Sequence, residues 1–307
     1  MLQEFVKRSA PLPPNSKLLI LGGGFSGQRI AFLARSLGSK AICTRRDLNS
    51  RGADLAFDTE TKIFPALDDL QEVTHMVSCI PPAINGSDPV LTHLKEELKS
   101  LPLLKWVGYL STTGVYGDCK GEWVSEKNEP KPQQARSKRR LACEQAWQQS
   151  GFPVQILRLP GIYGPGRSAL SSIRKGKSKT INKPGQVFSR IHVDDIAGAT
   201  IHLINLAHKG NKPPIINIAD NLPTSNIEVL RFAANLLGHS LPPPEPFESA
   251  AKDMSPMALS FWQENRKICN QMLCKELGYN LIYPDYKEGL KNCLIEEKLI
   301  DSKSNYE

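Results

Sequence analysis

The chain has few of the features that mark membrane, secreted or metal-binding proteins. No run of about 18 apolar residues, the length that a membrane-spanning helix needs, occurs in its 307 residues. The seven cysteines are odd in number and include no CxxC pair, which argues against a disulfide framework and against a zinc site. The start of the chain is polar and rich in proline, without the apolar segment of a signal peptide. These absences predict a cytoplasmic protein with reduced cysteines, no bound metal and no membrane contact.

Acidic residues are in deficit, because the formal net charge is +8. The positive excess is concentrated at residues 131–140 and 167–190, a pattern that attracts anionic ligands and predicts a small anionic substrate. A solvated basic surface explains the same charge equally well. No aromatic-rich motif of the kind that stacks RNA bases accompanies the basic stretches, so nucleic acid is not expected as a partner. The sequence leaves a homodimer open.

Short apolar runs alternate with helical patterns through most of the chain. The runs lie at 17–21, 41–43, 53–57, 76–80, 106–110 and 154–159, and a helical stretch at 195–206 precedes a further run at 214–219. Such alternation predicts an α/β fold with a Rossmann-type, doubly wound and mostly parallel sheet. We predict a flexible N-terminal arm at 1–16 and an NADP-binding domain at 17–165, whose sheet is completed by about 187–220. A smaller C-terminal substrate lobe would comprise 166–186 and 221–307.

Glycines at three positions form a phosphate-binding pattern directly after the first predicted strand. Gly22, Gly24 and Gly27 match GxGxxG between an apolar strand and an apolar-periodic helix. The first glycine permits a tight turn, the second lets the backbone approach a pyrophosphate, and the third allows close packing of helix against strand. The helix N–H groups then face the phosphates, so Phe25 and Ser26 are also expected to contact a dinucleotide cofactor.

The second predicted strand ends without the acidic residue that holds the ribose 2′-hydroxyl in NAD-binding proteins. Thr44, Arg45 and Arg46 stand there instead. Arginine can pair bidentately with a 2′-phosphate and Thr44 can add a hydroxyl, so this end favours NADP over NAD. The alternative is that the arginines are solvated and that Asp47 binds the ribose. Asp58, which ends the third predicted strand, is a candidate acceptor for the adenine edge or else a turn former.

Three further segments complete a family pattern, namely YLSTTGVYG at 109–117, RLPGIYGPG at 158–166 and RIHVDD at 190–195. With the glycine loop they resemble, in order and spacing, the extended short-chain dehydrogenase/reductase superfamily, the NAD(P)-dependent sugar-nucleotide epimerases and dehydratases. The resemblance covers residues 17–219 and implies an NAD(P)-dependent oxidoreductase or epimerase-like enzyme. It also implies cofactor contacts after the later strands, at Cys79, Ile80, Pro81, Ser111, Pro160 and Ile162.

The catalytic residues that the resemblance implies are only partly present. Thr112 matches the hydroxyl beside the substrate carbonyl, but Arg136 and Arg140 stand where the family carries the tyrosine and the lysine of its YxxxK dyad. A guanidinium cannot shuttle a proton near neutrality. Arg136 is therefore expected to hold an anionic substrate and Arg140 a ribose or phosphate, with a solvated basic helix face as the alternative. Tyr116, the nearest phenol, is a candidate substitute acid.

The expected substrate contacts are Arg167, Arg190 and His192, because the resemblance places them where the chain opens towards the substrate lobe and crosses the cleft. His192 has no second histidine or cysteine at ligand spacing and is not expected to bind metal. The leading hypothesis is an epimerase/dehydratase-like oxidoreductase that acts on a small anionic or sugar-nucleotide substrate. The alternative is a non-catalytic NADP-binding sensor or partner-binding protein.

Overall fold

A seven-stranded parallel sheet forms the centre of the computed structural model, which describes residues 2–304. The strand order is β11-β7-β5-β4-β1-β2-β3, so the chain changes direction along the sheet between β1 and β4. Ligands of such sheets bind outside the carboxyl ends of the strands at this switch point. The predicted doubly wound α/β fold is confirmed. The strands are β1 (Lys17–Leu21), β2 (Lys40–Arg45), β3 (Leu55–Ala56), β4 (His75–Ser78), β5 (Trp106–Thr112), β7 (Val154–Leu159) and β11 (Ile215–Asn217).

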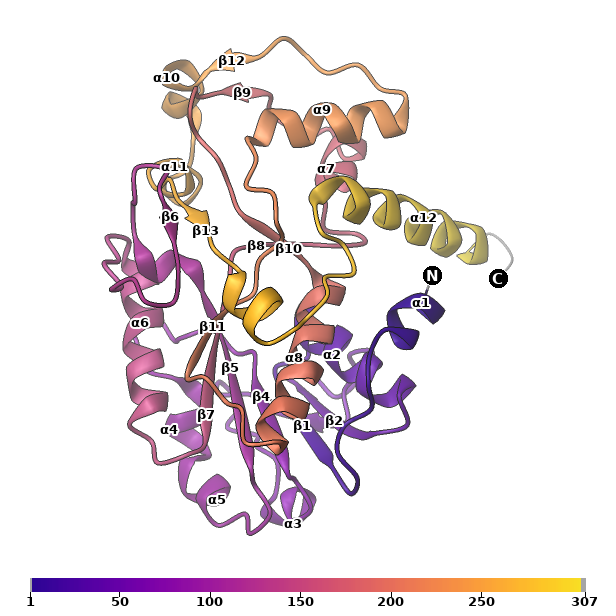
Figure 1. Cartoon of the computed structure of the whole chain (residues 1–307), viewed down its shortest axis with the longest axis vertical. Helices are drawn as coiled ribbons and strands as arrows, with labels where there is room; N and C mark the ends of the chain where they lie inside the picture. The colour runs from indigo at the N-terminus through magenta and orange to yellow at the C-terminus, as the bar shows by residue number, and fades with distance from the viewer. Residues whose placement is uncertain (1, 305–307) are drawn as a thin grey trace.

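Helices cover both faces of this sheet (Figure 1). Successive residues of β1 point to opposite faces, so that Leu18 and Ile20 belong to one apolar core and Leu19 and Leu21 to the other. The first core lies under α2 (Phe25–Ser36) and α8 (Val193–His208). The second core lies under the helices on the other face of the sheet, which are α3 (Leu67–Leu70), α4 (Pro89–His93), α5 (Lys95–Lys99) and α6 (Ala135–Gln148).

A second lobe lies above the sheet in Figure 1 and consists of helices and short strand pairs. Its helices are α7 (Ala169–Arg174), α9 (Asn226–Leu237), α10 (Phe247–Ala250), α11 (Pro256–Trp262) and α12 (Tyr286–Ser304), with single turns η1 (Thr113–Tyr116), η2 (Ala251–Asp253) and η3 (Met272–Glu276) nearby. Three two-stranded pairs connect them: β8 (Gly161–Tyr163) with β10 (Arg190–His192), β9 (Ile181–Asn182) with β12 (Glu245–Pro246), and β6 (Trp123–Val124) with β13 (Lys267–Ile268).

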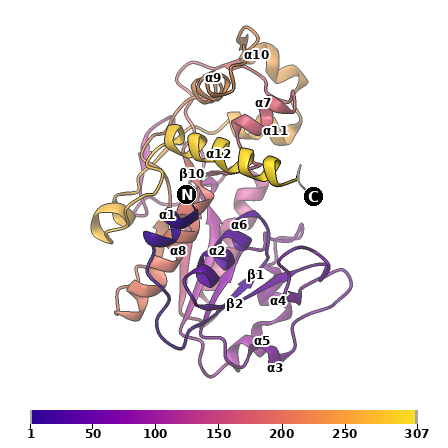
Figure 2. The same cartoon turned by 90° about the vertical axis from the view of Figure 1, so that its right-hand side faces the viewer.

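A buried ionic cluster joins the lobe to the sheet domain. Arg29 of α2 donates to both carboxylate oxygens of Asp194 at the start of α8, and its Nη2 also donates to Glu296 Oε1 of α12 at 2.9 Å. Asp195 accepts hydrogen bonds from the backbone N–H groups of Ile282 and Tyr283. Helix α12 consequently lies between α9 and α2, as Figures 1 and 2 both show.

The N-terminal arm differs from the expectation of a flexible segment. Residues Leu2–Lys7 form helix α1, and the Phe5 side chain is 1% exposed within the first core. The Arg29 guanidinium lies 5.4 Å from the centre of the Phe5 ring. The polar, proline-rich composition predicted a flexible arm, whereas burial of Phe5 and Leu12 holds the segment against α2 and α8.

Candidate functional site

The glycine loop has the geometry of a phosphate cradle. Gly22 has φ +96°, a conformation that L side chains rarely adopt, and a Cβ on Gly27 would lie 2.3 Å from the Gly22 carbonyl oxygen. A Cβ on Gly24 would meet nothing within 4 Å. Gly24 is also the N-cap of α2, where no side chain caps the helix and no acidic residue stands in the first turn. Open space in front of uncapped helix N–H groups fits a pyrophosphate.

A cleft of about 1030 Å³ opens over this loop at the switch point of the sheet. Most of the predicted cofactor residues line it: Gly22, Gly24, Phe25, Ser26, Gly27, Thr44, Arg45, Arg46, Cys79, Ile80, Pro81, Ser111 and Ile162. Pro160 instead lines the neighbouring cleft described below. Asp58 pairs with Ile63 through the backbone, and its carboxylate accepts hydrogen bonds from Thr61 and Glu60, so it forms a turn rather than an adenine contact.

The two arginines at the end of β2 both line this cleft, but they differ in exposure and in hydrogen bonding. Arg45 is half-buried and its Nη1 donates to the Arg51 carbonyl at 3.3 Å, whereas Arg46 is exposed. The Thr44 side chain is buried, and its hydroxyl accepts from the Gly22 N–H at 3.1 Å, which fixes the glycine loop. Asp47 also borders the cleft, but its Oδ1 accepts from the Asn49 backbone and side chain in a local turn.

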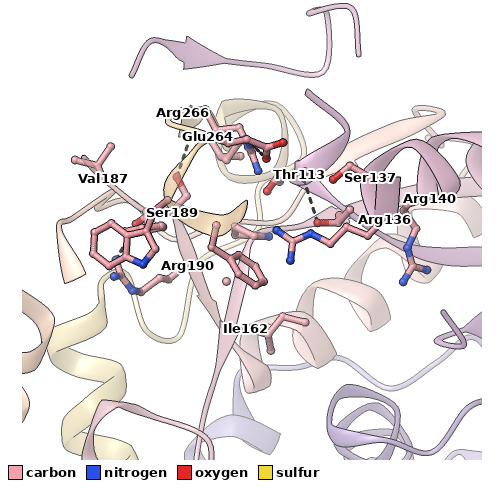
Figure 3. A pocket seen from close by; sticks show the side chains of 18 of the residues that line it. Thr113, Arg136, Ser137, Arg140, Ile162, Val187, Ser189, Arg190, Glu264 and Arg266 are labelled. Atoms are coloured by element: carbon pink, nitrogen blue, oxygen red, sulfur yellow. Dashed lines mark hydrogen bonds and ion pairs between the residues drawn. The ribbon is translucent and has the colours of Figure 1, made fainter. Parts of the chain in front are cut away.

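A second cleft of about 690 Å³ continues from the first and shares Pro81, Arg140 and Ile162 with it. Thr112, Arg136 and Arg140, which the sequence placed together, all line this cleft. Arg136 and Arg140 are one helical turn apart on α6, so both extend from one helix face towards the cleft (Figure 3). The Thr112 hydroxyl also accepts from the Gly114 N–H at 3.1 Å.

A family model for the NAD dependent epimerase/dehydratase family matches residues 18–219, about two thirds of the chain. The chain belongs to this family. "Protein YeeZ" of Escherichia coli K12 is 30% identical over 226 residues, which cover 71% of this chain and 75% of YeeZ. Membership explains why the glycine loop, the VYG segment and the later HVDD segment occur in one order.

Solved structures agree with this family assignment. A conserved protein of unknown function from Silicibacter pomeroyi DSS shares 36% identity and a TM-score of 0.81, covering 92% of this chain and 99% of that one. The human epimerase family protein SDR39U1, solved with NADPH, shares 18% identity and a TM-score of 0.69, covering 90% and 98%, and at that identity the likeness concerns the fold alone. Epimerase/dehydratase-family proteins therefore share the NAD(P)-binding fold of this chain.

Tyr116 lies away from the position that a family acid would need. Its side chain is 2% exposed, and its hydroxyl donates to Asn217 Oδ1 at 2.8 Å. The Arg158 guanidinium lies 4.8 Å from the ring centre, and burial raises the pKa of the phenol. The prediction of a substitute acid at Tyr116 is corrected, because its proton is committed to a buried partner below the cleft.

Arg140 and Ser111 are engaged with neighbouring protein groups. Arg140 Nη1 donates to the Tyr109 hydroxyl at 2.9 Å and to the Leu110 carbonyl at 3.1 Å, which holds the guanidinium at the junction of the two clefts. Ser111 donates to Glu144, which in turn pairs with Arg158 at 2.7 Å in a buried ion pair. Ser111 thus shapes the end of β5 while one edge of it faces the cofactor cleft.

Of the predicted substrate residues, Arg190 faces the second cleft and His192 does not reach it. Arg190 lines this cleft while its Nη1 donates to the Phe188 and Thr224 carbonyls. His192 is fully buried; its Nδ1 accepts from the Asp194 N–H and caps α8, and burial lowers its pKa to about 4. The substrate role predicted for His192 is therefore corrected to a structural one.

Arg167 lies beside the cofactor loop rather than deep in the second cleft. Its guanidinium is 5.4 Å from the centre of the Phe25 ring, and it borders both the cofactor cleft and a basic cavity of about 550 Å³. Exposed lysines of the 175–179 loop and serines of α7 line that cavity. Arg167 is positioned to meet a phosphate from either side.

Two charged residues of the second cleft carry no motif and were missed in the sequence. Glu264 and Arg266 lie on the strap, residues 262–268, which runs from the end of α11 through β13, and Figure 3 shows both near Thr113. They lie more than 120 positions after Arg140 and further still after Thr112, so no local spacing relates them to either residue. The pairing of β13 with β6, together with hydrogen bonds from the strap to Asp118 and Gly117, brings it to the cleft.

Within residues 2–304, no helix is long and apolar enough to cross a membrane, and no group of three or more histidine, cysteine or acidic side chains is arranged to hold a metal ion.

Proposed function

We propose that the protein is an NADP-dependent oxidoreductase or epimerase-like enzyme for a small anionic or sugar-nucleotide substrate. The observation that carries this proposal is the pair Arg45 and Arg46 in the cofactor cleft, at the strand end where NAD-binding proteins place a carboxylate. Asp47, the alternative ribose ligand, is engaged by Asn49.

The residues of the chain divide the work between the two clefts. The glycine loop and the start of α2 bind the pyrophosphate, and Arg45 and Arg46 bind the 2′-phosphate. When bound, NADP would accept a hydride from the substrate carbon or return one to it. Thr112 donates its hydroxyl hydrogen to a substrate oxygen, and the arginines of the second cleft neutralise the substrate's acidic group.

A titration with NADPH and NADH tests the cofactor assignment. The wild-type protein should bind NADPH more tightly, and Arg45→Ala should weaken NADPH binding by about tenfold to a hundredfold, the worth of one or two charge-assisted hydrogen bonds. NADH binding should change less than about twofold because NADH has no 2′-phosphate. Arg51→Ala, an exposed arginine in the same loop, is the matched control. Equal affinities of the wild-type protein for the two nucleotides would contradict the assignment.

A second candidate function is a non-catalytic NADP-binding sensor. The observation that favours it is the guanidinium at both dyad positions, Arg136 and Arg140, because neither can exchange a proton near neutrality. Measuring isotope exchange between 4-deuterated NADPH and a panel of carbonyl and nucleotide-sugar compounds separates the two. NADPH binding without exchange on any compound would favour the sensor, and exchange that Thr112→Val abolishes would favour the enzyme.

A further inference from the structure

Glu264 is a buried carboxylate with one oxygen unused. The residue is 6% exposed and lines the second cleft. Its Oε2 accepts from Arg266 Nη1 at 2.7 Å, and the same nitrogen donates to the Gly117 carbonyl at 2.7 Å. Its Oε1 is buried and has no hydrogen-bond partner among the described residues. Leaving a carboxylate oxygen buried without a donor is costly, which points to a donor on a ligand.

The strap that carries Glu264 is held in place from two sides. The Glu264 carbonyl accepts from Gln186 Nε2 at 2.9 Å, and the Asn265 N–H donates to Asp118 Oδ1 at 2.8 Å. Asn265 Nδ2 also donates to the Gly185 carbonyl at 2.9 Å. These contacts fix the backbone on both sides of the carboxylate. With Oε2 held by Arg266 as well, the carboxylate keeps its place at the wall of the cleft, and its Oε1 has no donor among the described residues.

Arg136 supplies the complementary charge in the same cleft. Its guanidinium stacks 3.6 Å from the centre of the Phe261 ring, and no ion pair between described residues includes it. Burial lowers the pKa of Arg136, and the Glu264 charge opposes that effect, so the two groups sense each other electrostatically. Each is held by its own anchor, Phe261 for the arginine and Arg266 for the carboxylate. Opposite charges that face one cleft without pairing leave room for a ligand between them.

The charge of the cleft decides which donor meets Glu264. Five guanidinium groups line the cleft with this single carboxylate, contributed by Arg136, Arg139, Arg140, Arg190 and Arg266. An ammonium group would enter an excess of positive charge, whereas a hydroxyl donates a hydrogen bond without that repulsion. The cleft therefore favours a neutral hydroxyl donor on a ligand that also carries an acidic group.

We propose that Arg136 and Glu264 form a two-ended recognition site for a small hydroxylated organic acid, with the acidic group on Arg136 and a hydroxyl on Glu264 Oε1. The inference rests on the proposed function, because this compound would be its substrate, and it specifies the substrate class. Glu264 also supplies a proton acceptor beside the substrate hydroxyl, a task that arginine at position 136 cannot perform.

Four probes on one ring test the proposal: cyclohexanecarboxylate, its 3- and 4-hydroxy derivatives, and 4-aminocyclohexanecarboxylate. Each is titrated by ligand-observed NMR into the full chain, with and without saturating NADPH. The better hydroxy acid should bind wild-type protein about tenfold more tightly than the unsubstituted acid, since a hydrogen bond to a charged acceptor has that worth. Glu264→Gln should remove most of this tenfold gain. Arg136→Gln should weaken all the acids about equally and keep the gain.

Matched controls are Glu122→Gln and Lys138→Gln, two exposed residues near the strap and on α6 that lie outside the cleft. The proposal is overturned if the hydroxy acids and the unsubstituted acid bind wild-type protein equally, or if 4-aminocyclohexanecarboxylate binds most tightly. It is also overturned if none of the probes binds to protein that does bind NADPH. NADPH titration of each variant serves as the folding check and separates the two proposals. Failure of the wild-type protein to bind NADPH would instead count against the proposed function.

Discussion

The substitutions Gly24→Ala and Gly27→Ala remove glycine from the same loop but are expected to damage the protein in different ways. A Cβ on Gly27 would lie 2.3 Å from the Gly22 carbonyl oxygen and 3.0 Å from the Ile20 side chain. Both neighbours belong to the buried β1 turn, so they cannot move without disturbing the sheet. Overpacking of this kind costs about 1–3 kcal/mol, which lowers the melting temperature by roughly 2–5 °C in a chain of this size.

Gly24→Ala should not destabilise the free protein. Gly24 has φ −75°, which alanine adopts without strain, and its added methyl group would occupy open space. Restricting the unfolded chain contributes about 0.4–1 kcal/mol of stability at such a position. The same methyl would stand where a pyrophosphate approaches the backbone, so NADPH affinity should fall by about tenfold or more.

Differential scanning fluorimetry and an NADPH fluorescence titration separate the two effects. We expect Gly27→Ala to lower the melting temperature of the free protein, and Gly24→Ala to lose nucleotide affinity at wild-type stability. Our interpretation of the loop is refuted if Gly24→Ala keeps wild-type NADPH affinity, or if it destabilises the free protein as much as Gly27→Ala.

Three further predictions concern buried polar groups. Arg29→Met should lower the free energy of unfolding by about 3–5 kcal/mol in urea denaturation, because it leaves two buried carboxylates unpaired. Breaking the half-exposed ion pair between Arg35 and Asp54 should lower it by less than about 1 kcal/mol. Burial raises the Asp220 pKa to about 8, whereas the same carboxyl in the unfolded chain ionises near its ordinary value of 3.8. The folded state therefore loses stability progressively as pH rises from about 4 to about 8, and the whole loss is present above about 8. Asp220→Asn should therefore raise the melting temperature at pH 9 relative to the wild-type protein and not at pH 4; an equal change at both would contradict the assignment. Tyr116→Phe should cost about 1 kcal/mol by removing the donor to Asn217 and leave NADPH affinity unchanged; loss of affinity would contradict the buried structural role given to Tyr116.

The sheet, the glycine loop and the joint position of three cleft residues could be predicted from the sequence. Each depends on a local signal: apolar runs between turn residues, glycines at fixed spacing, or the one-turn separation of Arg136 and Arg140 along a helix. Parallel strands then bring their carboxyl ends to one edge, so Thr112 and the glycine loop must lie near each other.

The failures concern residues whose environment depends on distant parts of the chain. His192 and Tyr116 lie in family segments that end at the cleft, yet each side chain points into protein, towards Asp194 and Asn217. Glu264 lies on a segment without a motif, and a short strand pair and hydrogen bonds to distant loops bring it to the site. One-dimensional spacing carries no information on which way a side chain turns at the end of a strand.

The ionic cluster at Arg29 links the cofactor helix to the last helix of the described chain. Arg29 is on α2, immediately behind the glycine loop, and one of its two carboxylate partners is Glu296 on α12. During synthesis the nucleotide-binding half therefore emerges long before the group that completes this cluster. The two lobes should unfold in one cooperative transition, and the stiffness of the phosphate cradle is set partly by a helix that is synthesised long after it.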